Sequence, residues 1–287
     1  MRASVRKYTS QPVSDELLNT LLEKASHTQT MGNLQLYSVV VTKDESMKER
    51  LAPAHFNQPM VMGAPVLLTF CADFRRTTDW ALNRQANPGY NNMLSFQNAT
   101  TDALLFCQRF CDLAEAEGLG LCFLGTTVYN PQLIIDTLHL PMLTFPVATI
   151  TLGWPDEKPQ PSDRLPLEAF VHQETYAPYT TERIDALYAF KESLPENAED
   201  FASRMNGYAE IGDIRGIEFN DRKVFITYSL VYDQDWYYTW LHLIQKIFEA
   251  ATAATRVFPE HQQPESEKYV MRSWLVRLGM GSHKFKG

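Results

Sequence analysis

A helix enclosed by protein on nearly all sides is predicted for residues 100–117. Its apolar residues recur at helical spacing and cover most of the helix circumference instead of one stripe. They are Ala103, Leu104, Phe106, Cys107, Phe110, Cys111 and Ala114. A helix with this pattern belongs at the centre of a domain, and Gly118 and Gly120 are expected to end it.

Short apolar runs predict the strands that such a helix would cover. Residues 36–42 are rich in Val and Tyr, and residues 64–70 are almost entirely apolar, which is typical of a strand buried on both faces. Residues 121–124 and 145–152 predict two further strands of the same core.

Helices are expected between and beside these strands. Ser14 is followed by two acidic residues and by leucines at helical spacing, which predicts an N-capped amphipathic helix that ends near Lys24. Residues 132–138 and 180–194 predict two more helices. Helices and strands mix without strict alternation, so the predicted fold class is α+β.

The final third of the chain is harder to interpret. Residues 223–232 alternate Val, Ile and Tyr and predict a strand, and residues 236–255 predict an aromatic-rich helix. A lone strand here would have to find a sheet edge elsewhere, which favours a dimerisation arm. The alternative is that this segment packs on its own subunit.

Charge and hydropathy exclude several classes of protein. A net charge of -8 argues against nucleic-acid binding, which requires a basic surface. The longest apolar runs fall far short of the ~20 residues that span a bilayer, so no membrane helix is expected. The start of the chain has no apolar signal region, and a cytoplasmic location is expected.

The four cysteines are interpreted as buried, reduced thiols, because Cys71, Cys107, Cys111 and Cys122 lie in apolar stretches. Cys107 and Cys111 share one helix face and offer a weak alternative as metal ligands, but no histidine pair stands nearby. No metal site is therefore predicted.

The common hydrolase and nucleotide-binding motifs are missing. The sequence has no phosphate loop, no Gly-x-Ser-x-Gly elbow and no His-Glu-x-x-His pair. Gly118 and Gly120 lack the third glycine of a dinucleotide fingerprint, because Phe123 stands in its place.

What remains is a set of cationic and amide side chains that suit a flavin phosphate, its ribityl hydroxyls and the polar edge of its ring. Taken alone, this set is more typical of surface arginines and ordinary loop amides than of a flavin site. Its members are Arg2, Ser4, Arg6, Asn33, Gln35, Gln58 and Arg164.

Six segments, covering about residues 1–180, together resemble the nitroreductase family, in particular its branch of larger flavin reductases and oxygen-insensitive nitroreductases. Their order is the order of the family. They are R-A-S-V-R-K-Y at 2–8, G-N-L-Q-L-Y-S at 32–38, F-N-Q-P at 56–59, A-P-V-L-L-T-F-C-A-D-F at 64–74, A-E-G-L-G-L-C-F-L-G at 116–125, and L-G-W-P at 152–155 with D-R-L-P at 163–166.

The resemblance implies a homodimer with a mixed central β-sheet surrounded by helices, and one FMN per subunit in a groove at the dimer interface. The arginines and Ser4 would hold the phosphate and ribityl chain, and the other residues would contact the ribityl chain or ring. The implied cofactor-binding residues are Arg2, Ser4, Arg6, Thr30, Gly32, Asn33, Gln35, Gln58, Gly125, Thr126 and Arg164. Ser162 stands where near relatives often have a lysine, which predicts weaker phosphate binding.

The resemblance also implies the reaction. Residues 1–195 would form an FMN-binding domain that passes reducing equivalents from NADPH or NADH to a nitroaromatic, quinone or flavin acceptor by a ping-pong mechanism. Residues 196–287 would form an unfamiliar extension. No catalytic acid or base is predicted, and four histidines are interpreted as surface or capping residues: His27, His55, His139 and His172.

Two alternatives stay open at this point. The first is another FMN reaction of the same family, such as reductive dehalogenation. The second is a flavin-binding or interaction module without turnover, for which the unfamiliar extension is the main argument.

Overall fold

The structure is a computed structural model that describes residues 2–89, 92–194, 216–220, 223–227 and 245–246. The chain forms two compact units, Met1–Arg164 and Leu165–Gly287. The helix expected at 236–255 lies outside the described residues except for 245–246, and the boundary expected at residue 195 stays a prediction. No helix among the described residues is long and apolar enough to cross a membrane.

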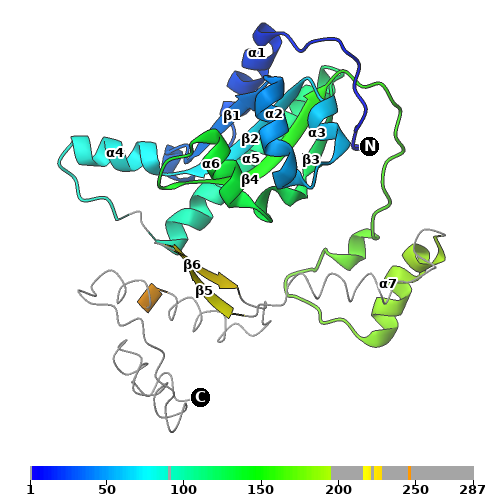
Figure 1. The fold of residues 1–287 in the computed structure, drawn as a ribbon. Coiled ribbons are helices and arrows are strands. Elements are labelled where there is room, and N and C mark those ends of the chain that lie inside the picture. Colours follow the sequence, from blue (N-terminus) through cyan, green and yellow to red (C-terminus); the bar gives the residue numbers. More distant parts are fainter. Residues whose placement is uncertain (1, 90–91, 195–215, 221–222, 228–244, 247–287) are drawn as a thin grey trace, which may run out of the picture. The chain divides into compact units, whose positions relative to one another are not determined.

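The first unit is built on a four-stranded sheet with the order β1-β2-β4-β3 (Figure 1). The strands are β1 (Tyr37–Thr42), β2 (Val66–Asp73), β3 (Gly120–Leu124) and β4 (Thr144–Gly153). All four lie where apolar runs predicted them. The α+β class is therefore confirmed.

The pairing of these strands differs from the mixed sheet that the family resemblance implied. Each neighbouring pair in this sheet is antiparallel, and the described part of the chain contains no parallel pair. The connection from β1 to β2 shows why. Thr42 at the end of β1 faces Leu67 at the start of β2, so the intervening helices leave and rejoin the same end of the sheet.

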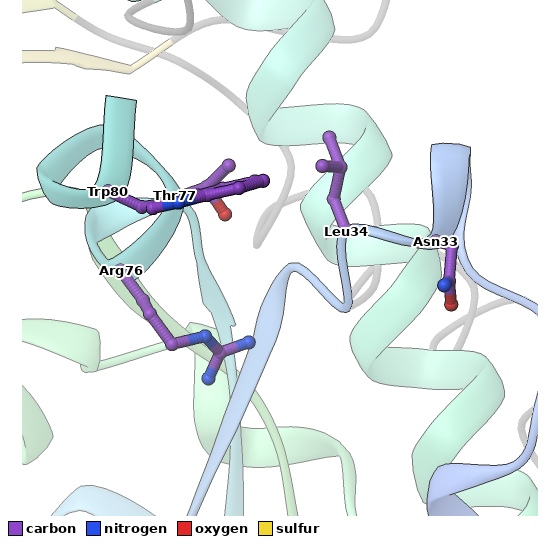
Figure 2. A pocket seen from close by; sticks show the side chains of 5 residues that line it. All are labelled: Asn33, Leu34, Arg76, Thr77 and Trp80. Carbon is purple, nitrogen blue, oxygen red and sulfur yellow. The ribbon is translucent and has the colours of Figure 1, made fainter. Parts of the chain in front are cut away.

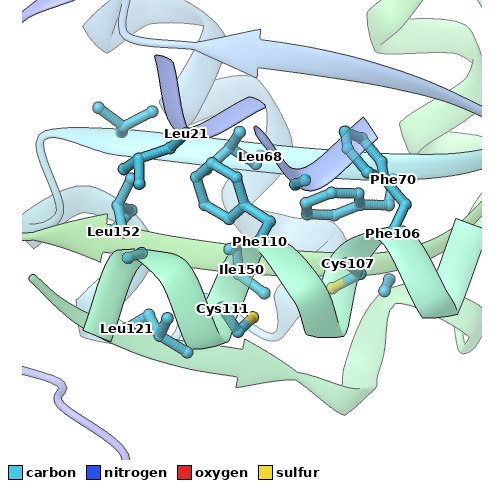
Figure 3. Close-up of a cluster of buried hydrophobic side chains, with 14 of the residues drawn as sticks. Leu21, Leu68, Phe70, Phe106, Cys107, Phe110, Cys111, Leu121, Ile150 and Leu152 are labelled. Atoms are coloured by element: carbon cyan, nitrogen blue, oxygen red, sulfur yellow. The ribbon is translucent and has the colours of Figure 1, made fainter. Parts of the chain in front are cut away.

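Helices α1 (Asp15–Ser26) and α5 (Met93–Ala116) cover one face of the sheet. Figure 3 shows Phe106 and Phe110 of α5 directed at the strands, where both rings contact Phe70. The side chain of Ser14 caps α1, as predicted. Helix α5 begins seven residues before the predicted start, because the side chain of Asn92 accepts a hydrogen bond from Ser95 N and caps it there.

Burial of α5 corrects the prediction that most of its circumference is enclosed. Its buried residues follow one face, with Ala99, Ala103, Phe106 and Phe110 among them. Leu104 and Leu105 point away from that face, and each is 40% exposed. Within this chain, α5 is therefore a one-sided helix with a second apolar surface.

The opposite face of the sheet is covered by short helices. They are α2 (Glu45–Leu51), η2 (Ala52–His55), α3 (Pro59–Gly63), η3 (Gly125–Val128) and α6 (Pro131–Leu138). The fully buried Lys48 joins α2 to the end of α3, because its Nζ donates to Ala64 O at 3.0 Å and lies 2.7 Å from Glu45 Oε1.

The N-terminal segment runs beside the edge strand β3. Val5 N donates to Leu121 O at 3.0 Å, and Tyr8 OH bonds Thr151 Oγ1 at 2.6 Å. A Cβ on Gly120 would lie 2.8 Å from the Val5 side chain, so a glycine is required for this close approach. These contacts fix the backbone that carries Arg2, Ser4 and Arg6.

Helix α4 (Arg75–Asn83) directly follows β2 and was not predicted from the sequence. Its first turn is highly polar, with Arg75, Arg76, Thr77 and Thr78 in succession. In Figure 1, α4 and the N-terminal segment lie at opposite ends of the first unit.

The second unit contains η4 (Leu167–Ala169), α7 (Thr181–Ser193), β5 (Gly216–Asn220) and β6 (Lys223–Thr227). The helix predicted at 180–194 is confirmed. The strand predicted at 223–232 is described only as β6, which pairs antiparallel with β5 of the same chain. The premise of a lone strand that must find a distant sheet edge is therefore wrong.

Candidate functional site

The loop that precedes β1 is held from inside the protein by Asp102, a buried carboxylate on α5. One carboxylate oxygen accepts from Met31 N at 2.8 Å, and the other accepts from Leu36 N at 3.1 Å. Both ends of residues 31–36 are thereby fixed to the central helix. Sequence reasoning missed Asp102, although an acidic residue on the apolar side of a helix was a visible signal.

Backbone strain marks the same loop. Gly32, Asn33 and Gln35 have φ values of 55°, 56° and 53°, in the left-handed region that non-glycine residues rarely adopt. Gln35 Nε2 donates to Asn33 Oδ1 at 3.2 Å, and Thr30 Oγ1 accepts from Gln35 N at 3.4 Å. The loop thus presents exposed amide groups in one fixed arrangement, as functional loops often do.

At the other end of the sheet, the N-terminal arginines flank β3. Arg2 Nε lies 3.0 Å from Glu115 Oε1, whereas the Arg6 side chain is exposed. Burial raises the pKa of the Cys122 thiol on β3, and the nearby charges of Arg6 and Arg2 oppose this rise. The positive charge of Arg6 therefore lies against β3, beside the half-buried Ser4.

His55 and Thr126 connect two of the turns on this face. His55 Nδ1 lies 2.9 Å from Thr126 Oγ1, and the imidazole is fully buried at the end of η2. Burial lowers the pKa of His55 to about 4. The interpretation of His55 as a surface or capping residue is wrong, because the short turn that carries it lies against η3.

Gln58 follows η2 and Gly125 begins η3, and both residues leave room or hydrogen-bonding groups for a ligand. Gln58 Oε1 is buried and has no hydrogen-bond partner among the described residues. Gln58 N donates to His55 O at 3.1 Å, which fixes the residue beside the histidine. A Cβ on Gly125 would meet no atom within 4 Å, so open space lies next to this turn.

Arg164 lies at the end of the first unit. Its Nη1 donates to Asp163 O at 2.7 Å and to Ser162 O at 3.3 Å, so the guanidinium folds back on its own loop. The side chain is exposed. No contact between Arg164 and the N-terminal arginines is present among the described residues.

Two groups of the predicted residues lie at opposite ends of the sheet. Arg2, Ser4 and Arg6 lie near the end of β4, where Gly120 of β3 faces Gly153. The loop of residues 30–35 lies at the other end, where Asp73 of β2 faces Thr144 at the start of β4. A strand of ten residues spans roughly 30 Å, so the two groups do not meet within one chain.

The residues on the face of β3, η2 and η3 fit a flavin mononucleotide. A phosphate suits the exposed guanidinium of Arg6 and the hydroxyl of Ser4, because both groups donate hydrogen bonds. The buried Gln58 Oε1 requires a donor, and a flavin ring carries an N–H group that supplies one. Open space at Gly125 leaves room for a planar ring.

Comparisons with known proteins agree with this fold. The model of the nitroreductase family matches residues 1–154. The chain is 32% identical over 180 residues to the FMN reductase [NAD(P)H] of Bacillus subtilis, covering 60% of this chain and 70% of that protein. It is 30% identical over 175 residues to the oxygen-insensitive NADPH nitroreductase of Salmonella typhimurium, covering 61% and 71%.

A solved structure from Bacteroides fragilis is 56% identical, with a TM-score of 0.69, and covers 71% of this chain and 83% of that chain. The protein belongs to the nitroreductase family, and the resemblance seen in its motifs is confirmed.

Proposed function

We propose that the protein is an FMN-dependent oxidoreductase that uses NADPH or NADH to reduce small electron-poor acceptors. Nitroaromatics, quinones and free flavin are the acceptor classes. The observation that carries this proposal is the buried Gln58 Oε1, which has no hydrogen-bond partner in the described part of the chain. It lies next to the His55–Thr126 contact. The names of the two curated relatives support the same reaction.

Each group of residues has a distinct task in binding FMN. Arg2, Ser4 and Arg6 hold the phosphate and the ribityl chain, and Arg164 closes on the phosphate after its guanidinium turns from its own loop. Gln58 accepts a hydrogen bond at the ring edge, and the backbone of Gly125 and Thr126 lines the ring face. Bound FMN supplies the hydride-accepting and hydride-donating ring, so the protein contributes binding, orientation and exclusion of water.

We assign no side chain as a general acid or base. His55 is the best-placed imidazole, but it is buried against Thr126 and neutral at physiological pH. The reduced nicotinamide and the acceptor occupy the same place in turn, which gives ping-pong kinetics.

A homodimer completes the site in this proposal. The loop of residues 30–35 lies too far from Arg6 to serve the same FMN within one chain, so the loop of one subunit contacts the FMN held by the other. Helix α5 supplies an apolar surface for the partner, because Leu94, Leu104 and Leu105 are 67%, 40% and 40% exposed. Residues 196–287 act as a further dimerisation arm in the same assembly.

We place the protein in the cytoplasm, where reduced nicotinamides are plentiful. All four cysteines are buried free thiols, which fits a reducing compartment.

Purification tests the proposed function directly. The purified dimer is expected to be yellow and to release FMN, with no FAD, after denaturation. Steady-state rates at several concentrations of NADPH and of a quinone should give parallel double-reciprocal lines. A colourless protein that binds no added FMN would contradict the proposal, and intersecting lines would place the acceptor at a separate site.

A further inference from the structure

A pocket of about 260 Å³ opens between the loop before β1 and helix α4, apart from the face of β3. Five residues line it: Asn33, Leu34, Arg76, Thr77 and Trp80. Figure 2 shows Trp80 and Leu34 extending from α4 and from the loop into the space between them. The family motifs assign no role to the three residues that α4 contributes.

Trp80 gives the pocket an aromatic wall. The residue is 60% exposed, which is unusual for so large an apolar side chain on a short helix. Leu34 lies across from it, and the buried Thr77 also lines the pocket. An indole face opposite an aliphatic side chain suits a planar ring that slides between them.

Arg76 gives the same pocket a positive charge. Its guanidinium donates to Gln35 O, and a guanidinium carries five N–H donors, so this one bond leaves others for a ligand. The neighbouring carboxylates are engaged elsewhere: Asp79 pairs with Arg75 at 2.7 Å, and Asp102 accepts from the loop backbone. The charge of Arg76 is therefore available to an anion.

The volume limits what can enter. Pockets for drug-sized ligands measure about 300–1,000 Å³, so a pocket of 260 Å³ suits a single substituted ring and excludes a whole dinucleotide. A planar carboxylate matches the fork of a guanidinium, whereas a neutral ring leaves that charge unused.

We propose that this pocket binds a single-ring aromatic carboxylate, and that it thereby selects anionic aromatic acceptors. Trp80 stacks on the ring, and Arg76 binds the carboxylate. The binding of the aromatic carboxylate depends only on the pocket. The selection of acceptors depends in addition on the proposed oxidoreductase function.

Calorimetry with 4-hydroxybenzoate, which carries no reducible nitro group, tests the binding. Arg76→Gln should weaken binding roughly 10- to 100-fold, and Trp80→Ala about tenfold. Trp80→Phe should retain most of the affinity. Arg84→Gln and Leu82→Ala are matched controls, since both residues lie on or next to α4 outside the pocket and should leave the affinity unchanged.

The wild type should bind benzamide at least tenfold more weakly than 4-hydroxybenzoate. The Arg76→Gln variant should bind benzamide as weakly as the wild type does. Equal affinities of the wild type and Arg76→Gln for 4-hydroxybenzoate would overturn the inference. Equal affinities of the wild type for 4-hydroxybenzoate and for benzamide would also overturn it. Melting temperatures of all variants identify any that fail to fold. If Trp80→Ala does not fold, Arg76→Gln with its Arg84→Gln control carries the test.

Activity separates this inference from the proposed function. The Arg76→Gln variant should raise KM for 4-nitrobenzoate and leave KM for 4-nitrobenzamide unchanged, with full FMN content. If the protein binds 4-hydroxybenzoate through Arg76 but takes up no FMN, the proposed ligand pocket is supported and the proposed oxidoreductase function is contradicted. If the protein is an active flavoprotein but binds no 4-hydroxybenzoate, the proposed oxidoreductase function is supported and the proposed ligand of the pocket is contradicted.

Discussion

His55 Nδ1 lies 2.9 Å from Thr126 Oγ1, and this contact ties the end of η2 to the turn after β3. The imidazole is fully buried, and its Nε2 has no partner among the described residues. Protonation would place a charge in an apolar setting, which is why burial lowers the pKa of His55 to about 4. The turn that lines the proposed ring site therefore depends on a neutral histidine.

This burial makes stability depend on pH. In the folded chain His55 stays neutral down to about pH 4, whereas in the unfolded chain it takes up a proton near pH 6.5. The unfolded state binds more protons in between, so stability from His55 is complete above pH 6.5 and is lost toward pH 4. The loss is on the order of 3 kcal/mol, since one pKa unit corresponds to about 1.4 kcal/mol.

Urea unfolding at pH 7.5 and pH 4.5 measures this loss. His55→Asn keeps a polar atom near Thr126 and removes the titration, so its stability should fall less between the two pH values than that of the wild type. His27→Asn, at the exposed end of α1, should behave like the wild type. Equal pH dependence in the wild type and His55→Asn would contradict the assignment.

Asp102→Asn should loosen the loop before β1. The carboxylate accepts two backbone hydrogen bonds, and an amide replaces one acceptor with a donor that faces Met31 N or Leu36 N. Loss of a charged hydrogen bond typically costs about 1.5–3 kcal/mol, so the free energy of unfolding should fall by about 2 kcal/mol. Asp112→Asn, on the exposed side of α5, should change it by less than about 0.5 kcal/mol. Equal melting temperatures for the two variants would show that Asp102 does not hold the loop.

The strands could be predicted from the sequence because burial on both faces leaves continuous apolar runs, as in β2. The order and direction of the strands could not be predicted, because an apolar run does not show at which end of the sheet the next strand begins. Helix α4 was missed for a different reason: most of its residues are polar, and the residue that it buries is Thr77 instead of an apolar side chain.

The candidate site shows the same limit. Arg6, Gln58 and Thr126 were predicted from family motifs. His55 and Asp102 act through burial and through contacts with residues far apart in the sequence, and of these two only Asp102 left a local signal, its place on the apolar side of a helix. The enclosed helix was predicted from apolar residues that cover most of its circumference, yet Leu104 and Leu105 are exposed. An apolar pattern predicts that a surface is buried, but it does not predict whether the same chain or another one buries it.

FMN affinity should depend unequally on the three arginines. Arg6→Ala and Arg164→Ala should each weaken FMN by about 2 kcal/mol, the order expected for one lost charged hydrogen bond. Arg2→Ala should have a smaller effect, because the Arg2 guanidinium already pairs with Glu115. Fluorescence titration of the apoprotein with FMN measures all three. Unchanged affinity in both Arg6→Ala and Arg164→Ala would show that these residues do not hold the phosphate.

The exposed side of α5 should be a dimer contact. Leu105→Glu places a charge on that surface, and light scattering should then report a monomer with reduced FMN content. Met142→Glu changes an apolar residue that is more exposed and lies outside α5, and it should leave the dimer intact. A monomeric wild type, or a Leu105→Glu variant that remains a dimer, would rule out this interface.

Anaerobic titration with NADPH and NADH tests the central claim that the protein is a flavin oxidoreductase. The visible absorbance of the copurified FMN should bleach with one equivalent of reduced nicotinamide per flavin. Addition of a quinone or nitroaromatic should restore it without oxygen. Flavin absorbance that persists with both nicotinamides would show a flavin-binding module without turnover and contradict the account.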